Sequence, residues 1–237
     1  MNTIVVLSAC ICRPTVHERC FGRLLELLKG CAVRFVVNID PVSGADGCSQ
    51  EDTRNALNAL ICSYGHPAEF FEPKSSCFFE ATRRLLKRGE DILDETSCIL
   101  WFEDDKFFRR DPRFVNIMKH NCANDVHHFW KKSAGCPTFH PCLWGYTAAK
   151  RYLFPAFYSA ARWDPELTMM AYWKKHYKGE LNVHYYKTFT EDVGRIWQAA
   201  NGLTKWVRER AGTSCVTYPT LAYSDGLQPE NILGSSG

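Results

Sequence analysis

The sequence predicts a mixed α/β protein with a mainly parallel central sheet flanked by helices. Short apolar runs rich in β-branched residues alternate with segments of helical periodicity through residues 1–105. The apolar runs are continuous, which is typical of parallel strands covered on both faces. Strands that alternate with helices of about ten to fifteen residues form βαβ units. A chain of 237 residues is long enough to bury one sizeable core, so we expect a single domain.

The first βα unit occupies residues 3–29. Residues 3–9 form an apolar run, and we expect this strand to end near Cys10. Arg13-Pro14 then breaks the chain, and residues 15–29 place apolar side chains at helical spacing before Gly30 ends the helix.

Further units follow the same alternation. A second strand, residues 33–39, is expected to end at Asp40-Pro41, before a loop rich in small residues. The remaining expected elements of this half are a helix at 50–64, a short strand at 68–71, a helix at 77–88 and a strand at 97–102.

The second half has a different character, because residues 127–130, 139–146 and 163–173 are aromatic and loop-rich. We expect this region to close over a site formed by the first half. The predicted organisation is therefore one domain over 1–237, with a nucleotide-sugar-binding half (1–105), an acceptor-binding half (106–227) and a disordered tail (228–237).

Composition excludes several classes of protein. The net charge is only +3 and the basic residues are spread along the chain, so the sequence predicts no nucleic-acid partner. The apolar stretch at residues 4–12 is too short to span a bilayer and has no basic leader. We expect no membrane span and a cytoplasmic location.

The twelve cysteines are scattered, so we interpret most of them as free, buried thiols. Cys10 and Cys12 form only a C-x-C pair, and this spacing does not indicate a structural zinc site built on cysteines.

Three consecutive carboxylates, Glu103-Asp104-Asp105, directly follow the apolar strand at 97–102. In an open α/β sheet, ligands bind beyond the carboxyl ends of the strands, where Arg13 and Asp40 also fall. The carboxylates would repel one another unless a cation neutralised them. A solvated turn is the alternative for any acidic triplet, but its position after a buried strand favours Mg²⁺ or Mn²⁺ bridging a diphosphate.

These motifs resemble the GT-A fold glycosyltransferases, which carry an acidic metal motif. The segment 9–16 (ACICRPTV), Asp40, the acidic triplet and Trp163-Asp164 are similar in order to the donor and base elements of N-acetylglucosaminyltransferase I. The resemblance covers residues 3 to about 175 in patches. It implies a GT-A, Rossmann-like fold, a uridine diphosphate (UDP) sugar as donor, and Mn²⁺ or Mg²⁺ as cofactor.

The resemblance also implies roles for individual residues. Arg13 would contact the donor diphosphate, Asp40 would accept a hydrogen bond from uracil, and Ala9 would line the donor site. Glu103 and Asp104 would hold the sugar and the ribose. Asp105 would be the direct metal ligand. Cys12 departs from the family pattern, which has an acidic residue before the arginine.

Transfer of a sugar with inversion needs a base near the acceptor hydroxyl. Asp164 is our candidate, and Glu166 is the second choice. Because Pro165 follows Asp164, this aspartate is equally well interpreted as the N-cap of an apolar helix, and the two interpretations are compatible.

Several other residues are weaker candidates for the donor site. Arg83 could reach phosphate, although an exposed basic helix face explains it as well. Asp192 and Arg195 could close over the donor, or could belong to a capped helix start with an internal ion pair. His184 could complete the metal coordination, although it also fits a strand.

The sequence therefore predicts a metal-dependent glycosyltransferase that moves a hexose or N-acetylhexosamine from a UDP-sugar, or another nucleotide diphosphate sugar, to a glycan hydroxyl. Inversion is the expected stereochemistry. The alternatives are a nucleotidyltransferase, which usually needs a glycine-rich loop after the first strand, and a non-catalytic nucleotide- or carbohydrate-binding module. Residues 9–14 contain no glycine.

Overall fold

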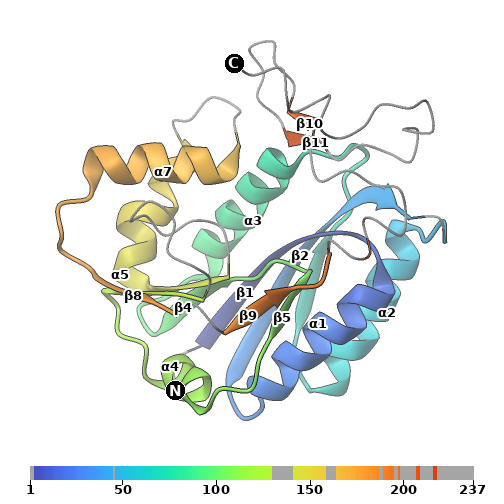
Figure 1. Cartoon of the computed structure of the whole chain (residues 1–237), viewed down its shortest axis with the longest axis horizontal. Coiled ribbons are helices and arrows are strands. Elements are labelled where there is room, and N and C mark those ends of the chain that lie inside the picture. Colours follow the sequence, from blue (N-terminus) through green and yellow to red (C-terminus); the bar gives the residue numbers. More distant parts are fainter. Residues whose placement is uncertain are drawn as a thin grey trace.

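A seven-stranded sheet forms the centre of the computed structural model, in the order β3-β2-β1-β4-β7-β6-β8 (Figure 1). The structure describes residues 3–44, 46–129, 141–158, 164–186, 189–194, 197, 207–208 and 216–217. The strands of this sheet are β1 (Thr3–Cys12), β2 (Ala32–Ser43), β3 (Ala68–Phe71), β4 (Ser97–Trp101), β6 (Asp125–His128), β7 (Cys142–Gly145) and β8 (Asn182–Tyr185).

The sheet is mainly parallel, as the sequence predicts. β1 pairs with β2 and β4 in parallel, β2 pairs with β3 in parallel, and β6 pairs with β8 in parallel. β7 is antiparallel to both of its neighbours, β4 and β6. Strands from both halves of the sequence thus join one sheet, and the two halves share its core.

Helices cover both faces of the sheet. α1 (Pro14–Leu27), α2 (Gln50–Ser63) and α4 (Pro112–His120) pack on one face. The other face carries α3 (Phe78–Ile92), α5 (Tyr146–Ala148), a π-helical turn (Ala149–Leu153), α6 (Pro155–Tyr158) and α7 (Pro165–His176). Successive side chains of β1 lie on opposite faces of the sheet, which explains the two layers. Ile4 and Val6 belong to the core under α1, α2 and α4, whereas Val5 and Leu7 belong to the core under α3 and α7.

The first-half elements lie near the residues where the sequence predicts them, with three corrections at their ends. β1 continues past Cys10 to Cys12, and α3 continues past residue 88 to Ile92. The second strand does not end at Asp40-Pro41, because β2 continues to Ser43. The register between β1 and β2 shifts there: Ile11 pairs with Asp40, but Cys12 pairs with Ser43. A proline is tolerated at such a bulge, where its missing N–H interrupts no regular ladder bond.

Two short ribbons lie outside the main sheet. β5 (Lys106–Phe108) pairs with β9 (Thr190–Asp192) in an antiparallel ribbon that borders the end of β4. β10 (Val207–Arg208) pairs with β11 (Val216–Thr217). The predicted disordered tail at 228–237 lies outside the described residues.

Among the described residues, no helix combines the length and the apolar character needed to cross a membrane. The described cysteines include nine free thiols, and Cys77 is disulfide-bonded. The prediction of mostly free cysteines is therefore confirmed for this part of the chain. Burial raises the pKa of Cys20 and of Cys98 to about 12, which keeps these thiols protonated.

Candidate functional site

The acidic triplet lies beside an overhanging end of β1. β4 ends at Trp101, and the next amide, that of Phe102, donates to the carbonyl of Leu7 at 2.9 Å. β1 runs on to Cys12 and turns into α1 through Arg13 alone. This difference in length places residues 103–105 against the last part of β1 and the first turn of α1.

Asp104 is buried and surrounded by donors. Arg13 holds it with two nitrogens: Nε lies 2.9 Å from Oδ2, and Nη2 is paired with Oδ1. His17 Nε2 donates to Oδ2 at 2.8 Å, and the amide of Ile11 donates at 3.4 Å. Burial alone would raise the pKa of Asp104, but Arg13 and His17 outweigh it and hold this pKa well below its usual range.

Asp105 faces two cations and keeps some exposure. Its Oδ2 lies 3.3 Å from Arg13 Nη2, and its Oδ1 lies 3.0 Å from Lys106 Nζ. Burial, together with the neighbouring Asp104 and Glu103, raises the pKa of Asp105 although Arg13 and Lys106 act to lower it. The two cations therefore do not fully offset the effects of burial and of the neighbouring carboxylates on Asp105.

Lys106 is the buried centre of a second group of carboxylates. Its Nζ lies 3.3 Å from Glu103 Oε2, 3.0 Å from Asp105 Oδ1 and 3.2 Å from Asp192 Oδ2. Asp192 reaches this point because β9 pairs with β5 in a register that aligns it with Lys106. Burial opposes the charge of Lys106, but the three carboxylates outweigh burial and raise its pKa.

We refer to Glu103, Asp104, Asp105 and Asp192, with Arg13 and Lys106, as the acidic cluster. Within this group of six described residues, four carboxylates stand against two permanent cations, a difference of two negative charges. His17 does not change this balance at neutral pH, because burial lowers its pKa despite the bond to Asp104. The cluster can accept one divalent cation by charge, and its oxygen donors suit Mg²⁺ or Mn²⁺.

Sequence reasoning did not find Lys106 or His17. His17 follows Arg13 by four residues on α1, and this spacing places both side chains on one face of a helix. Lys106 comes directly after the triplet, so its position alone was a signal. A single lysine is usually solvated, and only the pairing of β5 with β9 shows why this one is buried.

Asp40 lies in β2 and is almost fully buried. Its Oδ1 accepts from Asn38 Nδ2 at 2.8 Å, and its Oδ2 accepts from Ser76 Oγ and from the amide of Cys77, both at 3.2 Å. Burial raises the pKa of Asp40, although these bonds act to lower it. Arg84 donates to the Oδ1 of Asn38 and thereby joins this network.

The structure places the other donor-site candidates as follows. Arg83 is largely exposed and pairs with Glu80 at 3.8 Å, so its neighbour Arg84 is the arginine that lies near Asp40. Ala9 lies in β1, in register with Asn38, and is partly buried. Arg195 and Trp163 lie outside the described residues.

The two candidate bases lie at the start of α7. Asp164 is its N-cap, with Oδ1 accepting from the amide of Leu167 at 3.0 Å, and Pro165 is the first helical residue. The predicted capping role is thus confirmed. Glu166 lies in the first turn of the same helix. The catalytic role of either carboxylate stays a prediction.

His184 lies in β8, as one of its two interpretations predicted, and its partner across the sheet is His127 of β6. Asp125, His127 and His184 bring one potential ligand atom each within 4.8 Å of one another. We call these three residues the histidine cluster. Burial and the nearby His184 lower the pKa of His127 to about 4, so its imidazole is neutral at pH 7.

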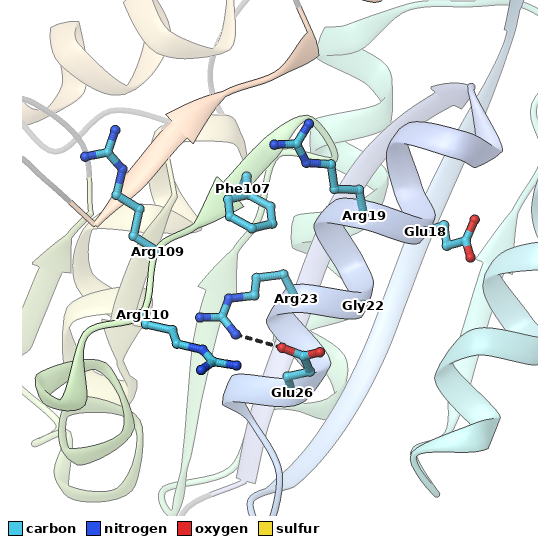
Figure 2. A pocket seen from close by; sticks show the side chains of 8 residues that line it. All are labelled: Glu18, Arg19, Gly22, Arg23, Glu26, Phe107, Arg109 and Arg110. Atoms are coloured by element: carbon cyan, nitrogen blue, oxygen red, sulfur yellow. Dashed lines mark hydrogen bonds and ion pairs between the residues drawn. The ribbon is translucent and has the colours of Figure 1, made fainter.

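A basic hollow lies on the outer side of β5 (Figure 2). Its volume is about 550 Å³, and it is lined by Glu18, Arg19, Gly22, Arg23, Glu26, Phe107, Arg109 and Arg110. Lys106 and Phe108 are buried, whereas Phe107 of the same strand lies under the guanidinium of Arg19 at 5.0 Å. β5 therefore separates this hollow from the acidic cluster.

The fold and the site define a mixed α/β protein with an acidic cluster at the carboxyl ends of two adjacent parallel strands. The sequence matches no protein-family model and no protein with a curated description.

Solved structures similar to this chain include two of the galactosyltransferase LgtC. One is a complex with donor and acceptor sugar analogues (14% identity, TM-score 0.46), and one is an active-site mutant (15% identity, TM-score 0.46). In both cases the similarity covers 77% of this chain and 72% of the other. Similarity at this level carries no argument about function, so the proposal below rests on the site.

Proposed function

We propose that this protein is a metal-dependent glycosyltransferase that moves a hexose or N-acetylhexosamine from a UDP-sugar to a glycan hydroxyl with inversion. The observation that supports it best is the acidic cluster, which follows the end of β4 and lies against the last part of the longer, parallel strand β1. Ligands of open α/β sheets bind in this place. The GT-A resemblance in the sequence points to the same residues.

A divalent cation fits the charge balance of the cluster. Asp105 and Glu103 retain exposure, and both face Lys106 together with Asp192. We assign Asp105 as the principal metal ligand, with Glu103 and Asp192 as neighbouring oxygen donors. When bound, Mn²⁺ or Mg²⁺ would offset charge on the leaving diphosphate.

Arg13 and Asp104 prepare this site. Because Arg13, His17 and the amide of Ile11 already surround the Asp104 carboxylate, we assign Asp104 to positioning rather than to direct contact with ribose. The same arginine lies 3.3 Å from Asp105, so it adds positive charge where the diphosphate would sit. His184 is left out of this site, because its nearby ligand atoms belong to Asp125 and His127.

Asp40 is the candidate for reading the nucleotide base. It is held by Asn38, Ser76 and the amide of Cys77, which fix the direction of its carboxylate. A carboxylate held in this way could accept the N–H of a uracil ring. Arg84, which donates to Asn38, would keep the network in place.

Asp164 is the proposed base for the acceptor hydroxyl, with Glu166 as the second choice. The proposed role needs a carboxylate within hydrogen-bond reach of the acceptor hydroxyl to take its proton. Its Oδ1 caps the start of α7, and a carboxylate offers more than one acceptor position, so the capping role and the proposed role are compatible.

One observation argues against the nucleotidyltransferase alternative. Such enzymes usually bind phosphate on a glycine-rich loop after the first strand, but here Arg13 is the single residue between β1 and α1. The binding-module alternative differs only in lacking catalysis, so an experiment must separate binding from transfer.

The central test measures binding. In thermal unfolding of the full chain, Mn²⁺ with UDP should raise the melting temperature by mass action, and Asp105→Ala should abolish the gain. Asp91→Ala is the matched control, because Asp91 is exposed on α3. Equal nucleotide binding by calorimetry with and without a chelator would exclude metal bridging.

A second test measures transfer. Asparagine is as good an N-cap as aspartate, so Asp164→Asn should leave the fold and donor binding intact. Donor hydrolysis and sugar transfer should nevertheless fall by roughly 100-fold or more, because the base is lost. Transfer at the wild-type rate would remove Asp164 from this role and make Glu166 the next variant.

A third test concerns the base of the nucleotide. Asp40→Ala should weaken uridine nucleotides selectively relative to adenosine nucleotides of the same phosphate content. Calorimetric titration with both series measures this preference. An unchanged preference would remove Asp40 from the base pocket, while the metal-binding assignment would stand.

A further inference from the structure

The histidine cluster lies on the edge of the sheet, away from the carboxyl end of β1. β8 is the outermost strand, and its pairing with β6 places His184 opposite His127. Asp125 precedes His127 by two residues on β6, so the two side chains emerge on the same face. Three metal-ligating side chains from two neighbouring strands thus converge.

One nitrogen in this cluster is buried and has no hydrogen-bond partner among the described residues. It is Nε2 of His127, whose side chain is only 8% exposed. This nitrogen lies 3.8 Å from Asp125 Oδ2. Two ligands of a tetrahedral zinc ion are separated by roughly 3.3 Å, so only a small rotation brings both into a zinc coordination sphere.

The remaining contacts hold these ligands in orientation. His127 Nδ1 lies 3.1 Å from the Tyr186 hydroxyl, which leaves Nε2 as the nitrogen directed at Asp125. The His127 ring stacks on His184, with centroids 4.6 Å apart and planes at 11°. The Tyr186 hydroxyl is the kind of hydrogen-bond partner that usually orients a metal-ligating histidine from outside the coordination sphere.

The carboxylate of Asp125 is held as well. Its Oδ1 accepts from Asn182 Nδ2 at 2.9 Å, and its Oδ2 accepts from the amide of Cys122 at 3.1 Å. Asn182 belongs to β8, so this bond and the stacked histidines both tie the edge strand to β6.

We propose that Asp125, His127 and His184 bind a divalent transition metal of the zinc type, separate from the acidic cluster. Imidazole nitrogens favour zinc over the hard cations that the acidic cluster would take. His184 is exposed, so an ion can enter from solvent, and water would complete the coordination. The bound ion would link β8 to β6 at the open edge of the sheet.

The experiment uses the full chain, stripped with a chelator and titrated with ZnCl₂ alone by calorimetry, with metal content measured after dialysis. One equivalent of zinc should remain bound and should raise the melting temperature. His184→Gln should weaken binding by roughly 100-fold or more, because a direct ligand is lost. His176→Gln is the matched control, since His176 is also exposed and stacked on an aromatic ring, that of Tyr172.

The outcomes separate this site from the others. Without metal, His184→Gln should unfold like the wild type, because surface substitutions usually cost less than about 0.5 kcal/mol. Zinc held by the exposed thiols Cys62 and Cys122 would persist in His184→Gln and would overturn the proposal. The proposal would also be overturned if only Asp105→Ala removed zinc binding, or if the wild-type chain retained no zinc. Failure of the UDP experiment would leave this result unaffected.

Discussion

The acidic cluster and the histidine cluster are both groups of potential metal ligands, but they are stabilised in different ways. The acidic cluster contains its own cations, because Arg13 and Lys106 lie within 3.3 Å of its carboxylates. The histidine cluster contains neutral His127, and one of its buried nitrogens has no hydrogen bond within the part of the chain that the structure describes. The first is therefore held together by the chain itself, whereas the second would be completed by an ion.

This difference has an energetic consequence. The carboxylates of the acidic cluster are already partly neutralised by Arg13 and Lys106. A metal ion should therefore bind there more tightly when the phosphates of a nucleotide also coordinate it. A metal in the histidine cluster would satisfy groups that the fold leaves incomplete, so its binding should appear directly as stability. The predictions below test the acidic half of this comparison, starting from the largest expected effect.

The largest effect should follow from breaking the buried ion pair of Arg13 and Asp104. Asp104→Ala would leave a buried guanidinium and a buried histidine without their shared acceptor. We expect a loss of about 3–5 kcal/mol in the free energy of unfolding, measured by urea denaturation. The exposed Asp91→Ala should change it by less than about 0.5 kcal/mol. A loss below about 1 kcal/mol would mean that Asp104 does not organise the cluster.

A smaller effect on stability is expected from removing the ammonium group of Lys106, which lies among three carboxylates. Lys106→Met would leave Glu103, Asp105 and Asp192 close together without their ammonium. We expect a loss of about 2–3 kcal/mol in a metal-free buffer, because the remaining carboxylates repel and are partly desolvated. Thermal and urea unfolding measure this loss.

The same variant sharpens the comparison with metal present. Mn²⁺ should stabilise Lys106→Met more than it stabilises the wild type, because the ion would replace the missing charge. Lys87→Met, at an exposed position of α3, should respond to Mn²⁺ as the wild type does. If Mn²⁺ stabilises Lys106→Met no more than the wild type, the cluster does not bind a divalent cation at this position.

Much of the first half of the fold could be predicted, because each strand there is a continuous apolar run and each helix has a clear periodicity. The strand that contains Asp40 was expected to end too early, since Pro41 usually breaks a ladder and the bulge that accommodates it depends on β1. The second half was harder: its described strands are only two to four residues long, and tertiary pairing determines them.

The site divides in the same way. Consecutive carboxylates after an apolar strand are visible in the sequence, and the structure gathers Arg13, Asp104 and Asp105 as expected. Contacts between residues that only strand pairing brings together cannot be recognised in the sequence. Asp192 reaches Lys106 only through the β5–β9 ribbon, and His184 reaches His127 only through the pairing of β6 with β8.

The smallest effect concerns pH and tests whether His17 is neutral within the acidic cluster. Burial lowers the pKa of His17 below its unfolded value of about 6.5, so the unfolded chain binds more protons just below that pH. The free energy of unfolding should therefore decrease as pH falls through about 6.5. In His17→Gln, the amide nitrogen can keep the hydrogen bond to Asp104, but the side chain does not titrate.

Urea unfolding from about pH 7.5 to about pH 5 should thus show a flatter profile for His17→Gln than for the wild type, because the wild type alone loses the contribution of neutral, buried His17 as pH falls. Every other titratable side chain is the same in the two proteins, so the difference between the two profiles isolates His17. Parallel profiles would mean that folding leaves the pKa of His17 unchanged, and a wild type that gains stability relative to His17→Gln as pH falls would mean that His17 is protonated in the folded protein. The cluster would then carry a third positive charge, and the charge balance that favours a divalent cation there would be reduced to a single negative charge.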